Sequence, residues 1–90
     1  MIAVVYKFPI GVTDKQLISM PKGAKILTVQ FQNGILCLWA LCDKAAPKAH
    51  REIFIHGTGH EVFYYELPYI GTVQQAGGAL IWHVFDGGEL

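Results

Sequence analysis

Long apolar runs are absent from this sequence, and their absence excludes a membrane-spanning helix. Hydrophobic residues make up 52% of the 90 residues, but they fall in short segments. No segment reaches the ~18 consecutive apolar residues that such a helix requires. The first residues, MIAVVYKFPIG, also lack the basic segment and the small-residue cleavage site of a secretory signal. We therefore expect a cytoplasmic protein with no membrane contact.

Charge of either sign is sparse, and no basic run occurs. Seven basic and seven acidic residues give a net charge of zero, which excludes tight, non-specific binding of long nucleic acid. The charges are nevertheless segregated: residues 1–51 carry 7 − 2 = +5, and residues 52–90 carry −5. This segregation predicts either a basic face for an anionic ligand or mutual neutralisation of neighbouring strands.

Cysteine and serine are both scarce, which limits disulfide and nucleophile chemistry. Cys37 and Cys42 are five positions apart on one predicted strand, about 16 Å at ~3.3 Å per residue. A disulfide needs Cα atoms within about 7 Å, so we expect two reduced thiols. Ser19 is the only serine and has no nucleophile motif around it. We expect no catalytic residue, and a binding protein in preference to an enzyme.

The strongest structural signal lies in residues 24–42. Asn33-Gly34 separates two apolar segments, and this dipeptide favours a two-residue hairpin turn because both positions must adopt positive φ. In the first arm Leu27, Val29 and Phe31 alternate with polar residues, which predicts one core-facing side. Residues 35–42 are apolar on both sides. This second strand either lies between two layers or lends its second face to a partner subunit.

The rest of the chain also predicts short strands separated by turns. We expect strands at residues 2–8, 12–21, 50–56, 69–75 and 79–86, with a loop at 43–49, a short irregular strand as one option for 60–65, a glycine-rich turn at 76–78 and a frayed tail at 87–90. Residues 12–21 also carry a weak helix-capping pattern, but alternation favours a strand. The prediction is a single all-β domain over residues 1–90, a compact antiparallel sandwich or partly closed barrel of six to seven short strands.

The densest cluster of polar and glycine residues is the segment 56–60, HGTGH. Two glycines around a threonine can turn backbone N–H groups toward an anion. The segment lacks the lysine of a P-loop and the third glycine of a dinucleotide fingerprint, so those motifs are excluded. A plain turn and a ligand-contacting loop both remain consistent with the segment.

Three histidines, His56, His60 and His83, can meet if the last strand lies beside the strand at 50–56. Zinc binding is one interpretation. The H-x₃-H spacing, however, crosses a glycine turn and not a helix face, so we expect no metal and no cofactor. Ligand contact or acid–base chemistry near neutral pH are the other interpretations.

The aromatic residues Trp39, Trp82 and 63–65 predict packing first and base stacking second. In the second case a basic residue such as Lys22, Lys25 or Arg51 meets a phosphate. The predicted ligand-binding residues are His56, Gly57, Thr58, Gly59, His60, His83, Trp82, Arg51 and Lys25.

The blocks at residues 20–41 (MPKGAKILTVQFQNGILCLWAL), 56–60 (HGTGH) and 69–85 (YIGTVQQAGGALIWHVF) resemble a known family. It consists of short bacteriophage and prophage proteins of uncharacterised function that share MPxGAxILxVQ, LWA, GTGH, YIGT and HVF blocks. The resemblance covers nearly the whole chain. It implies a phage origin and action in the cytoplasm of an infected bacterium, and it brings no catalytic residues.

The resemblance and the residues together predict a phage accessory protein for host takeover or anti-defence. We expect a homo-oligomer that sequesters a small anionic ligand, such as a nucleotide immune signal, at the HGTGH segment. His60→Ala is then expected to weaken binding without unfolding the protein. The alternatives are a protein–protein inhibitor of a host defence complex, a structural phage component that uses the central hairpin, and a small hydrolase that uses the histidines.

Overall fold

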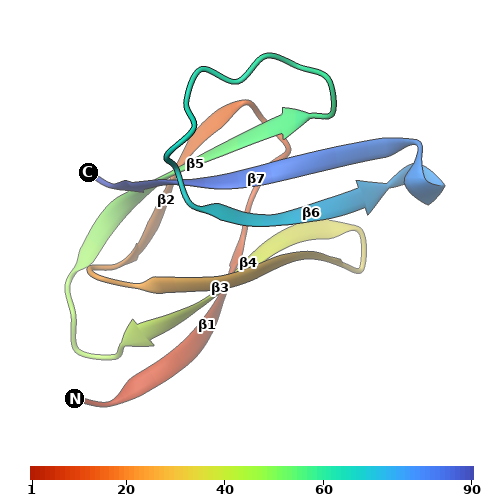
Figure 1. The fold of residues 1–90 in the computed structure, drawn as a ribbon. Coiled ribbons are helices and arrows are strands. Elements are labelled where there is room, and N and C mark those ends of the chain that lie inside the picture. The colour runs from red at the N-terminus through yellow and green to blue at the C-terminus, as the bar shows by residue number, and fades with distance from the viewer.

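The computed structural model describes residues 1–90, which form seven β-strands arranged in two antiparallel sheets (Figure 1). The strands are β1 (Ala3–Pro9), β2 (Lys15–Pro21), β3 (Lys25–Gln32), β4 (Ile35–Asp43), β5 (Lys48–Gly57), β6 (Tyr69–Gln75) and β7 (Leu80–Glu89). A 3₁₀ turn, Ala76–Gly78, joins β6 to β7. No helix is long and apolar enough to cross a membrane.

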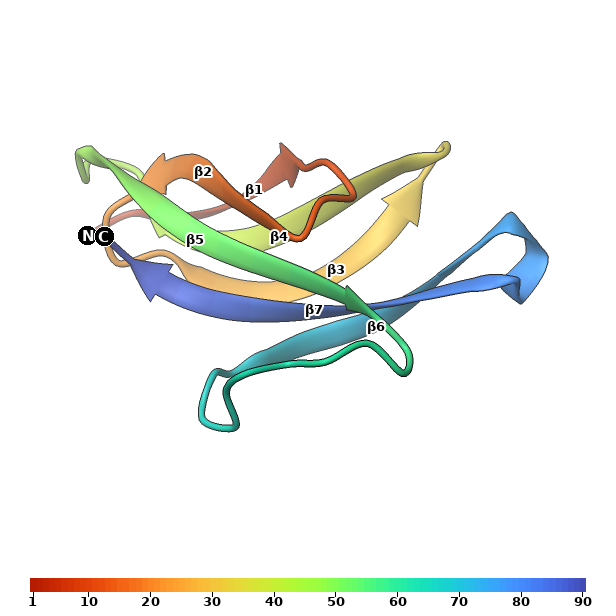
Figure 2. The ribbon, with the colours of Figure 1, turned by 90° about the horizontal axis from the view of Figure 1, so that it is seen from above.

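The sheets have the strand orders β1-β4-β3 and β2-β5-β7-β6. β4 is the central strand of the first sheet, and β5 and β7 are central in the second. β3 also lies beside β6, so the two sheets meet along that side (Figures 1 and 2). The all-β prediction is confirmed, and the open strand orders make the fold a sandwich and not a closed barrel.

The central hairpin forms as predicted. Asn33 has φ 50° and Gly34 has φ 80°, and they connect the paired residues Gln32 and Ile35. These are the positive φ values that a two-residue turn needs to match the strand twist. Residues 15–21 of the predicted 12–21 segment are also a strand, paired with β5.

Three predictions about local structure are wrong. Residues 87–90 are not frayed: β7 continues to Glu89, and the Leu90 N–H donates to His50 O at 2.9 Å. Residues 60–65 form no strand, because a tyrosine of this connection packs onto the sheet and the segment has no ladder partner. The loop predicted at 43–49 is shorter, since β4 includes Asp43 and β5 begins at Lys48.

A β-bulge changes which side chains of β3 reach the core. The register with β4 shifts between Ile26 and Thr28, so Leu27 is an extra residue. Ile26 packs against the core and Leu27 is 47% exposed, contrary to the predicted inward alternation of Leu27. Val29 and Phe31 beyond the bulge do face the core, as predicted.

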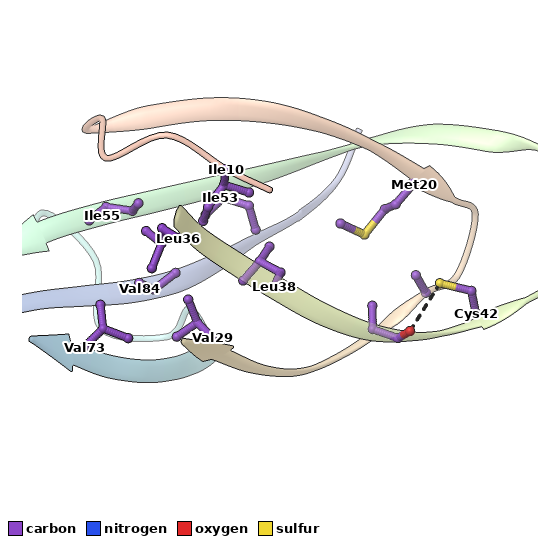
Figure 3. Packing of buried hydrophobic residues seen from close by; sticks show 12 residues of the cluster. Ile10, Met20, Val29, Leu36, Leu38, Cys42, Ile53, Ile55, Val73 and Val84 are labelled. Atoms are coloured by element: carbon purple, nitrogen blue, oxygen red, sulfur yellow. Dashed lines mark hydrogen bonds between the residues drawn. The ribbon is translucent and has the colours of Figure 1, made fainter. Parts of the chain in front are cut away.

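The core lies between the sheets (Figure 3). Alternate residues of β4, including Leu36 and Leu38, meet Ile53 of β5 and Val84 of β7. Leu38, Ile53 and Val84 have no exposed surface. Because β4 uses only its even-numbered residues for this contact, its other face is left on the outside of the sandwich.

Candidate functional site

Imidazole and hydroxyl groups gather on the outer face of the second sheet. His56 of β5 lies directly opposite His83 of β7, and Thr72 of β6 lies opposite His83 on the other side. These residues alternate with Ile55 and Val84, which point into the core, so strand periodicity places the histidines outside. The connection between β5 and β6 then adds Thr58 and Tyr64 to the same face.

Both ring nitrogens of His83 are occupied. Nε2 lies 2.6 Å from Thr58 Oγ1, and Nδ1 lies 2.6 Å from the Tyr69 hydroxyl, which also bonds to Thr72 Oγ1. A neutral imidazole donates from one nitrogen and accepts at the other. In either neutral tautomer, one hydroxyl neighbour donates to His83 and the other accepts from it. Thr58, His83 and Tyr69 form a hydroxyl–base–orienter series.

His56 holds the Tyr64 side chain against the sheet. His56 Nε2 lies 2.5 Å from the Tyr64 hydroxyl, and the Tyr64 ring packs tilted against Phe54 and edge-to-face against Phe85, with centroids 5.2 and 5.4 Å away. Burial raises the pKa of the Tyr64 hydroxyl. This contact fastens the middle of the β5–β6 connection to the sheet.

His60 lies over Gly57 at the start of that connection. A Cβ at Gly57 would stand 3.0 Å from His60 Cε1, so any larger residue there would displace the imidazole. Gly57, His60 and Trp82 line two adjacent shallow cavities of about 230 and 190 Å³. The structure thus brings together Gly57, Thr58, His60, Trp82 and, through Thr58, His83.

Arg51 is part of a buried ion pair and lies away from this group. Its Nε and Nη2 donate to the two carboxylate oxygens of Asp86 at 2.8 and 2.7 Å, and Nη1 donates to Ala24 O at 2.7 Å. Arg51 precedes His56 on β5 by five positions, about 16 Å along the strand.

The hydrogen bonds of this pair shift both pKa values. Burial by itself would raise the pKa of Asp86, but hydrogen bonds from Arg51 and from the Gly88 N–H, with the arginine charge, lower it overall. The hydrogen bond with Asp86 raises the pKa of Arg51, against the opposing effect of burial. The guanidinium of Arg51 therefore makes a structural contact within the chain.

Lys25 is also remote from the histidines. It begins β3 and pairs with Leu41 on the outer face of the first sheet. The predicted ligand-binding residues therefore separate into a histidine–hydroxyl group without lysine or arginine and two distant basic residues. No three His, Cys, Asp or Glu side chains lie close enough together to hold a metal ion.

A second hollow, which sequence reasoning missed, gathers lysines. This lysine cleft has a volume of about 320 Å³ and lies between β1, the end of β2 and the β4–β5 connection. It is lined by Tyr6, Lys7, Phe8, Pro21, Lys44, Ala46 and Lys48. None of these lining residues is acidic. The only sequence signal for it was the charge of +5 in residues 1–51.

Backbone hydrogen bonds hold the β4–β5 connection in place beside the cleft. Asp43 Oδ1 accepts from the Ala45 N–H at 3.0 Å, and Pro47 O accepts from the Lys22 N–H at 2.7 Å. The β4–β5 connection and the turn between β2 and β3 lie at the same end of the sandwich (Figures 1 and 2). Lys48 also lines a neighbouring cavity of about 420 Å³, together with Lys22, His50 and Glu89.

Comparison with known proteins places the chain in a family. Residues 1–89 match the family described as domain of unknown function (DUF7352), so the chain belongs to that family. No curated protein and no solved structure matches the chain.

Proposed function

We propose that this member of the DUF7352 family is a phage accessory protein that binds a small anionic ligand, such as a nucleotide, without chemically changing it. The ligand occupies the lysine cleft, and the protein acts in the cytoplasm of the infected bacterium. The observation that carries the proposal is the concentration of lysines around a hollow with no acidic lining residue.

The charge of the cleft suits phosphate. Lys44 and Lys48 have no carboxylate within ion-pair distance, since the two ion pairs of the chain are Lys15–Glu52 and Arg51–Asp86. Lys7 Nζ donates to Gln32 Oε1 at 2.8 Å, so it is the one cleft lysine with a side-chain partner. Two ammonium groups without a partner supply point charges for a phosphate.

The shape and the aromatic lining of the cleft suit a nucleotide. Its volume of about 320 Å³ falls within the range of small-molecule sites, roughly 300–1,000 Å³. Tyr6 and Phe8 of β1 offer apolar surface to a base, and the far edge of β1 has no strand partner. Backbone N–H and C=O groups on that edge are available to a polar ligand.

Isothermal titration calorimetry with mono-, di- and cyclic dinucleotides tests this function. Lys44→Ala and Lys48→Ala are each expected to weaken the binding of the best ligand by about tenfold or more, as expected for a lost charged hydrogen bond. Lys15→Ala is the matched control, because Lys15 is 63% exposed and pairs with Glu52 outside the cleft. An equal loss in Lys15→Ala would mean general electrostatic attraction and no cleft site.

His60→Ala distinguishes the cleft from the HGTGH segment that the sequence favours. If the ligand occupies the cleft, His60→Ala keeps its affinity. A loss confined to His60→Ala moves the site to the cavities beside Trp82. Mass spectrometry of the bound and released ligand separates binding from turnover, since a sequestering protein returns the ligand intact.

The Thr58–His83–Tyr69 series supports a second candidate function, a small hydrolase. Its distances, 2.6 Å on each side of the imidazole, lie in the range at which a base can activate a hydroxyl nucleophile. Release of p-nitrophenol from p-nitrophenyl acetate by the wild type, lost in Thr58→Val, would favour the hydrolase. Equal rates in both proteins would exclude it for esters.

A further inference from the structure

Two large aromatic side chains project from the β5–β6 connection. Phe63 is 86% exposed and Tyr65 is fully exposed, although Tyr64 between them packs on the sheet. In an extended segment successive side chains point to opposite sides, so burying Tyr64 turns both of its neighbours toward solvent. We call residues 61–66 the aromatic loop.

An apolar surface also lies open on the opposite side of the sandwich. It consists of the odd-numbered side chains of β4 and their partners on β1 and β3, and we call it the outer face of the first sheet. Val5, Ile35 and Leu41 are 51%, 55% and 39% exposed there, whereas Trp39 on the same face is half-buried and Cys37 is buried. Exposed apolar surface of this kind is typical of interaction sites.

The two surfaces carry opposite charges. The aromatic loop contains Glu61 and Glu66 and no basic residue except His60 at its border. On the outer face, Lys7 pairs with Trp39 and Lys25 pairs with Leu41, and the one acidic side chain, Asp43 at the end of β4, accepts from the Ala45 N–H. Aromatic side chains flanked by carboxylates therefore match an apolar strip flanked by ammonium groups.

We propose that the aromatic loop of one copy binds the outer face of the first sheet of a second copy. Phe63 and Tyr65 cover Ile35 and Leu41, and the loop glutamates approach Lys7 and Lys25. Each copy then buries both of its exposed apolar surfaces. The chain can bind a second copy of itself because it carries both the aromatic loop and the outer face that the loop fits.

The position of the two surfaces determines the type of assembly. Tyr64 anchors the loop on the outer side of the second sheet, while the partner surface is the outer side of the first sheet. A symmetric dimer, in which both copies use the same patch around a two-fold axis, therefore cannot bury both surfaces. The contact is head-to-tail, and it produces a ring or an open stack.

Size-exclusion chromatography with light scattering on the full chain tests this contact. Wild type is expected to form an oligomer larger than a dimer. A loop variant, Phe63→Ser with Tyr65→Ser, and a face variant, Ile35→Glu, are each expected to be monomeric. All three sites are exposed, so unchanged melting temperatures identify variants that remain folded. Leu80→Ser, at an exposed apolar residue outside both surfaces, is the control that keeps the oligomer.

Mixing the two variants gives the decisive result. The loop variant retains an intact outer face, and the face variant retains an intact aromatic loop. An equimolar mixture can therefore form one loop–face contact and is expected to give a two-chain complex. A mixture that stays monomeric, or a wild type that stays monomeric at the highest soluble concentration, overturns the proposal. The anion-binding variants Lys44→Ala and Lys48→Ala lie outside both surfaces, so failure here leaves the cleft test unaffected.

Discussion

Removing either partner of the Arg51–Asp86 pair is expected to destabilise the fold strongly, whereas removing both is expected to cost much less. The two side chains are only 13% and 12% exposed, and the guanidinium makes two hydrogen bonds to the carboxylate. Its third bond reaches Ala24 O, just before β3. The pair therefore links β5 and β7 to the other sheet.

The magnitude follows from burial. Arg51→Met or Asp86→Leu leaves one buried charge without its counter-ion, which costs about 3–5 kcal/mol. A chain of this size has a free energy of unfolding of roughly 5–13 kcal/mol, so either loss is a large fraction of the total. The double variant has no buried charge left, and its main costs are the unpaired Ala24 carbonyl and the unpaired Gly88 N–H, about 1–3 kcal/mol each where water does not reach them.

Equilibrium unfolding in urea, followed by tryptophan fluorescence, measures the four free energies of the double-mutant cycle. The expected result is that the double variant is more stable than either single variant. Single losses below about 1 kcal/mol, the range of surface ion pairs, would refute the reasoning. So would a double loss equal to the sum of the single losses.

The same double variant tests the predicted ligand role of Arg51. If Arg51 is only structural, the folded double variant binds the best nucleotide with wild-type affinity in calorimetry. A loss of affinity in a folded double variant would show that the guanidinium contacts the ligand after all.

Three further predictions concern pH, packing and the loop anchor. Because the pKa of Asp86 is lowered, its ionised form stabilises the fold above about pH 4, the ordinary unfolded value, and this stabilisation is lost as pH falls through the lower folded pKa. Melting temperatures of Arg51→Met/Asp86→Leu measured across acid pH should lack this loss. Gly87→Ala should cost about 1–3 kcal/mol in urea unfolding, since its Cβ would stand 2.6 Å from Phe54 Cε2, and Gly11→Ala, with its nearest contact at 3.6 Å, should cost little. Tyr64→Phe removes the hydrogen bond to His56, about 0.5–1.5 kcal/mol, and should speed amide exchange in residues 58–68, whereas unchanged exchange would count against the anchor.

The sequence predicted those elements whose signals are local. Asn33-Gly34 specified a turn because few residues tolerate two successive positive φ values, and alternation separated residues 15–21 from a helix. The bulge at Leu27 gave no such signal, because it depends on how β3 pairs with β4. The ordered end of β7 was missed for the same reason, since its partners are in β5.

Only part of the candidate site followed from the sequence. The meeting of His56 and His83 required β5 and β7 to be neighbours, a condition that the sequence left open and that only the strand pairing fulfils. The network around His83 also needed Tyr69 from β6, which spacing along the chain does not indicate. Arg51 was assigned to a ligand as a basic residue that could meet a phosphate, and its ion pair was missed because Asp86 lies 35 positions away.

The sequence by itself determined the composition of the surfaces: strands with period two, a central strand apolar on both sides, and basic residues confined to the first 51 positions. Tertiary structure decided where these features act. It directed the even side of β4 into the core and left the odd side outside, gathered Lys7, Lys44 and Lys48 around one cleft, and turned Phe63 and Tyr65 outward. The reason is that register and sheet order are set by contacts between distant strands, which no local pattern encodes.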